Sequence, residues 1–175
     1  MKRLLTALMA LGALPAAGLA QEAHSPYAHE GSEQVKTLSQ QEVDDLLEGA
    51  GMGLARQAEL NQYPGPRHVL DLADSLALSA EQRRAVEETF ADMQGRAKAL
   101  GRQILDAERA LDAAFAAGGI TEEALVTAVT RIADLQGELR AVHLRAHLAT
   151  RETLTRHQIH EYDRLRGYGG GHEHG

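Results

Sequence analysis

Residues 78–119 read LSAEQRRAVEETFADMQGRAKALGRQILDAERALDAAFAAGG, and this stretch decides the fold. Its apolar residues recur at alternating spacings of four and three, the heptad pattern of a helix that packs along one seam. Ser79 is a suitable N-cap with Gln82 as its capping-box partner, and Gly118-Gly119 can end the helix. The pattern therefore predicts one long helix. Its seam comprises Val86, Phe90, Met93, Ala97, Leu100, Ile104, Ala107, Leu111 and Ala114.

A second heptad helix follows the two glycines. Thr121 can cap it, and Ile120 can staple onto Leu125. Two long helices with apolar seams, joined by a short loop, are expected to pack as an antiparallel hairpin. The sequence therefore predicts an all-α fold built on this hairpin. The second seam comprises Leu125, Ala128, Ile132, Leu135, Leu139, Val142, Ala146 and Ala149.

Short helices are expected on both sides of the hairpin, within a domain that spans residues 67–168. Leu154-Thr155-Arg156-His157-Gln158 repeats the capping box and predicts a last helix. Residues 38–66 hold a short helix and a connector rich in Gly and Pro, which either wraps over the hairpin or extends a dimer contact. Residues 21–37 and 169–175 are interpreted as flexible tails.

The first twenty residues have the pattern of a cleavable signal peptide. Basic Lys2-Arg3 precedes an uncharged apolar run, and small residues lead to a cleavage site after Ala20. The alternative is a membrane anchor, but the apolar run is shorter than the roughly 20 residues that span a bilayer. We therefore expect residues 1–20 to direct export, with no stable membrane insertion of the product.

The composition excludes several classes of function. The 175 residues carry a formal net charge of −7, which argues against a nucleic-acid partner because such a partner needs a basic surface. There is no cysteine, so disulfides, thiolate metal sites and thiol nucleophiles are excluded. No nucleophile elbow, His-Glu-x-x-His motif or phosphate loop is present, and we expect no enzyme activity.

Two copies of Leu-Ser/Thr-x-x-Gln bracket the hairpin. One copy comprises Leu78, Ser79 and Gln82, and the other comprises Leu154, Thr155 and Gln158. A single copy is an ordinary capping box with a hydrophobic staple. Two copies around a heptad hairpin, behind a signal peptide, resemble the Spy/CpxP family of periplasmic proteins with LTxxQ motifs and their relatives among heavy-metal sensor and resistance proteins.

The resemblance implies a curved, all-α homodimer in the periplasm. It also implies a stress protein that binds unfolded or envelope proteins without ATP, and such a protein requires no cofactor. A third hypothesis is a structural protein whose only role is to pair with an envelope partner.

The alternative function is that of a periplasmic heavy-metal sensor or buffer. His143 and His147 are four residues apart, so they share a helix face and can chelate one metal ion. Pairing the two arms about the glycine turn places acidic Glu87, Glu88 and Asp92 nearby. Imidazoles with a carboxylate suit Zn, Ni, Co or Cu(II). The competing interpretation is that both histidines are surface or packing residues.

Histidines in the tails offer a weaker possibility. His172 and His174 lie in the C-terminal tail, where neutral imidazoles can scavenge metal weakly near pH 7.

Overall fold

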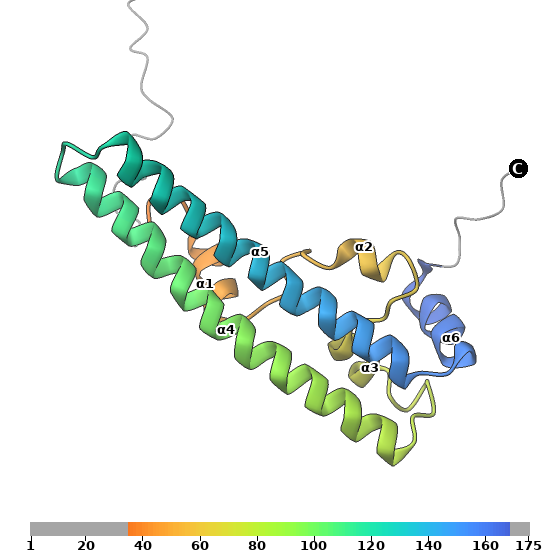
Figure 1. Ribbon diagram of the computed structural model, residues 1–175. Coiled ribbons are helices and arrows are strands. Elements are labelled where there is room, and N and C mark those ends of the chain that lie inside the picture. Colours follow the sequence, from red (N-terminus) through yellow and green to blue (C-terminus); the bar gives the residue numbers. More distant parts are fainter. Residues whose placement is uncertain (1–34, 169–175) are drawn as a thin grey trace, which may run out of the picture. The chain divides into compact units, whose positions relative to one another are not determined.

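The structure is a computed structural model that describes residues 35–168, and these form six helices and no strand. The predicted all-α fold class is confirmed. Helices α4 and α5 are the two arms of the hairpin, and the shorter helices lie near them (Figure 1). The helices are α1 (Gln40–Glu48), α2 (Arg56–Glu59), α3 (Pro66–Asp71), α4 (Ala80–Ala116), α5 (Glu122–Thr153) and α6 (Arg156–Arg166).

The hairpin begins and turns where its caps indicate. The Ser79 hydroxyl accepts a hydrogen bond from the backbone N–H of Gln82, whose side chain returns to the Ser79 backbone. Gly118 and Gly119 both have positive φ, at 70° and 83°, which lets the chain reverse without a Cβ clash. Thr121 then caps α5. These local signals fix the lengths of both arms.

The apolar seams form the main core of the described region. Ile104 of α4 and Leu135 of α5 are each 1% exposed, and burial of such a side chain contributes roughly 1.5–3 kcal/mol. A second cluster, which includes Val86, Leu154 and Tyr162, fills the end of the hairpin where α3 and α6 pack. Burial is weaker at the hairpin tip, where Phe115 is exposed.

Helix α1 crosses the hairpin at a glycine. A Cβ added to Gly101 of α4 would overlap the backbone oxygen of Leu46, so only glycine allows this close approach. Val43 and Leu46 of α1 are buried in the main core. Ser39 caps α1 in a third capping box with Glu42, and Gly49 ends it with φ of 67°.

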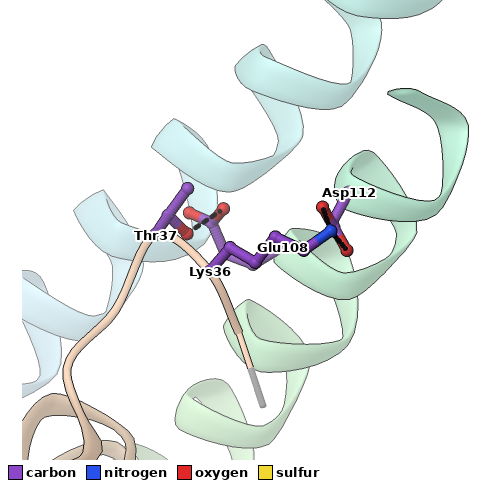
Figure 2. Close-up of polar contacts among 4 residues, drawn as sticks. All are labelled: Lys36, Thr37, Glu108 and Asp112. Carbon is purple, nitrogen blue, oxygen red and sulfur yellow. Dashed lines mark hydrogen bonds and ion pairs between the residues drawn. The ribbon is translucent and has the colours of Figure 1, made fainter. Parts of the chain in front are cut away.

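The packed region starts earlier than the sequence indicates. Residues 35–37 fall in the expected flexible tail 21–37, but Val35 is buried in the main core. The Lys36 ammonium donates to both carboxylate oxygens of Asp112, at 2.8 and 3.0 Å. Thr37 donates to Glu108 at 3.0 Å, so this segment is held along α4 (Figure 2). The sequence does not indicate this packing, because Lys36 and Thr37 bond to partners more than 70 residues away.

The Gly/Pro-rich connector packs against α5 of the hairpin, and its part in a dimer contact stays a prediction. The Arg140 guanidinium on α5 donates to the Gln57 side chain at 2.7 Å. Arg151 of α5 donates to the Gln62 carbonyl at 3.1 Å, and its guanidinium lies 4.6 Å from the ring centre of Tyr63. These contacts hold residues 56–65 against one side of α5.

Several expectations fall outside the described residues. They are the signal peptide 1–20, the tail up to residue 34, and the tail 169–175 with His172 and His174. The curvature and the homodimer implied by the resemblance stay predictions. No helix within residues 35–168 is long and apolar enough to cross a membrane.

Candidate metal site

His143 and His147 lie on α5 beneath the connector. Both are buried, with relative exposures of 3% and 7%. The sequence places them at the edge of the hairpin seam, where one turn of helix separates them. Residues 59–66 close over that edge and turn it into an interior wall. The pair therefore lines a cavity of about 810 Å³.

The backbone of the connector orients the ring of His147. Its Nδ1 lies 2.7 Å from the carbonyl oxygen of Tyr63. A carbonyl can only accept, so Nδ1 carries the proton and donates it. In the neutral ring, Nε2 is then left with a free lone pair. A backbone carbonyl that orients an imidazole in this way is a common supporting contact at metal sites.

His143 presents an unsatisfied nitrogen. Its Nε2 is buried and has no hydrogen-bond partner within residues 35–168. Burial lowers the pKa of His143, and the neighbouring His147 lowers it further. The ring is therefore neutral at pH 7. A buried polar atom without a partner costs about 1–3 kcal/mol, so the position calls for a ligand or a compensating function.

Glu59 is the acidic residue that the sequence does not point to. A Cβ built on Gly65 would meet Glu59 Oε1 at 3.0 Å and His147 Nε2 at 3.1 Å, so both side chains approach this glycine. Glu59 lies in a connector without apolar periodicity, and no sequence signal places it beside α5.

Tyr162 of α6 holds the Glu59 carboxylate. Its hydroxyl lies 2.9 and 2.8 Å from the two carboxylate oxygens and donates to them. Burial first, and then the charge of Glu59, raises the pKa of Tyr162, so the phenol keeps its proton. Glu59 is thus positioned by α6 while it faces the histidine cavity.

The predicted carboxylates do not join the histidines. Glu88 and Asp92 line a different hollow, together with Arg145, and Glu87 is exposed. Asp92 instead pairs with Arg96 at 3.1 Å. Pairing residues across the hairpin predicts how far along α4 a side chain lies. It does not predict which face of the helix carries it, and these carboxylates point away from the histidines. In the arrangement of residues 35–168, no three His, Asp or Glu side chains are close enough to hold a metal ion.

The six LTxxQ residues cap helices or pack in the apolar core. Ser79 and Thr155 are the N-caps of α4 and α6, and Gln82 and Gln158 complete their capping boxes. Leu78 and Leu154 pack in the second apolar cluster. The two boxes meet at the open end of the hairpin through their glutamines. None of the six motif residues lines the histidine cavity.

The donor set fits a heavy metal in part. Imidazoles with a carboxylate are the ligands that Zn, Ni, Co and Cu(II) accept, and the Nε2 of His143 has no hydrogen-bond partner within residues 35–168. No curated protein and no solved structure matches the chain. The heavy-metal resistance family model matches residues 2–160, nearly the whole sequence. The chain therefore belongs to the heavy-metal resistance family, a Spy/CpxP-like group of helical metal-resistance and sensor proteins.

Proposed function

We propose that this protein binds a divalent transition metal through His143 and His147 and acts as a passive metal sensor or buffer in the periplasm. Proteins of the family are typically secreted to that compartment. The observation that carries the proposal is the buried pair of imidazoles, one whose Nε2 has no partner within residues 35–168 and the other oriented through its Nδ1 by the Tyr63 carbonyl.

Glu59 is the third candidate ligand in this proposal. Its carboxylate and His147 Nε2 both approach Gly65, and its hydrogen-bond partner within the described residues is the Tyr162 hydroxyl. Exchange of that neutral hydrogen bond for a bond to a divalent cation is favourable for a carboxylate. Metal binding would therefore draw Glu59 away from α6, which links the occupancy of the site to the packing of the connector.

Calorimetric titration with Zn, Ni, Co and Cu tests the proposal. A His143→Ala, His147→Ala double variant is expected to lose the tight site. The matched control is His157→Ala, His160→Ala, which removes an exposed pair on α6 and should leave binding unchanged. A His172→Ala, His174→Ala variant measures scavenging by the tail. If the α5 double variant binds as tightly as the wild type, the site is elsewhere.

A second candidate function is ATP-independent holding of unfolded proteins. Large apolar side chains are exposed on both arms of the hairpin, where they could bind the apolar segments of a client. These side chains are Phe115, Val126, Val129 and Leu148.

Suppression of client aggregation tests this second function. The purified protein, at several-fold excess, should slow the aggregation of a chemically unfolded client. A Val126→Ser, Val129→Ser variant should lose this effect while it keeps metal binding, because both residues lie outside the histidine cavity. Absence of suppression with every client tried would leave metal binding as the function.

A further inference from the structure

The histidine cavity is much larger than a metal ion. Its volume of about 810 Å³ lies in the range of pockets that hold small organic ligands, roughly 300–1,000 Å³. It is bounded by the end of α1, the connector, α3, both arms of the hairpin and the C-terminal end of α6 with Tyr168. Part of its wall is apolar, including Phe90 and Met93. A bare ion at His143 and His147 would leave most of this space to water.

The charge of the lining is unfavourable for a bare cation. Only two carboxylates of the described residues line the cavity, those of Glu48 and Glu59, and Tyr162 already holds Glu59. None of the lining Arg and Lys residues forms an ion pair with a carboxylate within residues 35–168. Four such cations therefore line the cavity, three of them exposed and Lys98 half-buried, in a chain of net charge −7. They are Arg56, Arg67, Lys98 and Arg166.

The number of protein ligands also argues against a bare metal ion in this cavity. Zn²⁺ takes four ligands and octahedral metals take six, but no three His, Asp or Glu side chains within residues 35–168 are close enough to hold an ion. Two imidazoles leave coordination positions open. An anionic chelator would fill these positions with oxygen atoms, occupy the cavity and face the four cations.

We propose that the cavity takes its metal as a complex with a small organic polycarboxylate. This inference rests on the proposed metal function and names the form in which the metal binds. His143 and His147 supply nitrogen ligands to the metal. Arg67 of α3 and Lys98 of α4 pair with the carboxylates of the chelator.

Cobalt(II) and citrate are suitable probes. Equilibrium dialysis with isotope-labelled citrate measures how much citrate the full protein retains, and the visible absorption of Co²⁺ reports nitrogen coordination. We expect one citrate to be retained per protein when Co²⁺ is present, and almost none when it is absent. Citrate that only strips Co²⁺ from the protein, without being retained itself, would overturn the inference.

Removal of two cavity cations should change the affinities for Co²⁺ and for Co²⁺–citrate differently. An Arg67→Gln, Lys98→Gln variant should lose affinity for Co²⁺–citrate by at least about tenfold, because two attractive charges are removed. The same variant should bind Co²⁺ alone as tightly as the wild type or more tightly, because two repulsive charges are removed. The control is Arg84→Gln, Arg102→Gln, which neutralises two exposed cations of α4 outside the cavity and should change neither affinity.

The two proposals fail in different ways. If Co²⁺ binding in the absence of citrate does not depend on His143 and His147, the proposed function is wrong. If that binding needs both histidines but the Arg67→Gln, Lys98→Gln variant weakens Co²⁺ and Co²⁺–citrate equally, only the polycarboxylate inference is wrong.

Discussion

Gln82 and Gln158 exchange hydrogen bonds through their side-chain amides. Gln82 Nε2 donates to Gln158 Oε1 at 3.0 Å, and Gln158 Nε2 donates to Gln82 Oε1 at 3.1 Å. The same two oxygens accept the backbone N–H groups of Ser79 and Thr155. Each carboxamide therefore caps its own helix with its oxygen and binds the other capping box with its nitrogen.

The pair explains why two LTxxQ motifs occur together. Gln82 Nε2 also donates to the Thr153 carbonyl at 2.9 Å, and Gln158 Nε2 donates to the Leu76 carbonyl at 3.2 Å. These bonds join the start of α4, the end of α5 and the start of α6. A glutamate would cap either helix equally well, but only an amide can both accept and donate.

Gln158→Glu should therefore lower the free energy of unfolding by about 1–3 kcal/mol, although it keeps the capping box. The new carboxylate would face Gln82 Oε1 and the Leu76 carbonyl without a proton to donate. The effect should not be additive with that of Gln82→Glu, because both changes break the same link. Urea unfolding of the two single variants and the double variant measures it.

The third capping box supplies the control. Ser39 and Glu42 form the same local motif at α1, where the Glu42 side chain bonds only within its own box among the described residues. Glu42→Gln should change stability by less than about 0.5 kcal/mol, as an exposed substitution does. An equally small effect of Gln158→Glu would mean that the two boxes act independently.

Local signals in the sequence are sufficient to predict the hairpin. The caps at Ser79, Thr121 and Thr155 and the glycine turn were predicted correctly because each depends on residues within a few positions. The connector was not predictable in the same way. It has no periodicity, and long-range contacts fix it, such as that between Tyr63 and His147. For the same reason the sequence does not indicate that Glu59 lies in the wall of the histidine cavity.

Gly101→Ala should destabilise the protein, because the new Cβ would collide with the Leu46 backbone. A backbone cannot rotate away as a side chain can, so α1 must shift. We expect a loss of about 1–3 kcal/mol, typical of overpacking. Thermal or urea unfolding measures it.

Gly95 is the matched control, since it lies on α4 and nothing is within 4 Å of the position that a Cβ would take there. Gly95→Ala should stabilise the helix by about 0.5–1 kcal/mol. Equal effects at the two positions would show that α1 does not pack on Gly101 in solution.

Tyr162→Phe should affect stability and metal binding in opposite directions. The variant loses the only hydroxyl that donates to Glu59 within the described residues and leaves a partly buried carboxylate without that partner. A loss of about 1–3 kcal/mol is expected without metal. Glu59 is then free to bind Co²⁺, so Co²⁺ should restore part of the loss and bind more tightly than to the wild type. Unfolding with and without Co²⁺ measures both effects, and weaker Co²⁺ binding would show that Glu59 is not a ligand.

His143→Leu should stabilise the metal-free protein while it removes the metal site. The orphaned Nε2 contributes nothing to stability without a ligand, and leucine fills a similar volume without a polar atom, so a gain of about 1 kcal/mol is expected. His147→Leu should do the reverse and cost about 1–2 kcal/mol, because it strands the Tyr63 carbonyl. Both variants should lose the stabilisation that Co²⁺ gives the wild type, which follows from binding linkage. Chelator-treated protein, unfolded in urea with and without Co²⁺, provides the measurement. A His143→Leu variant less stable than the wild type would falsify the view that this nitrogen is kept for a ligand.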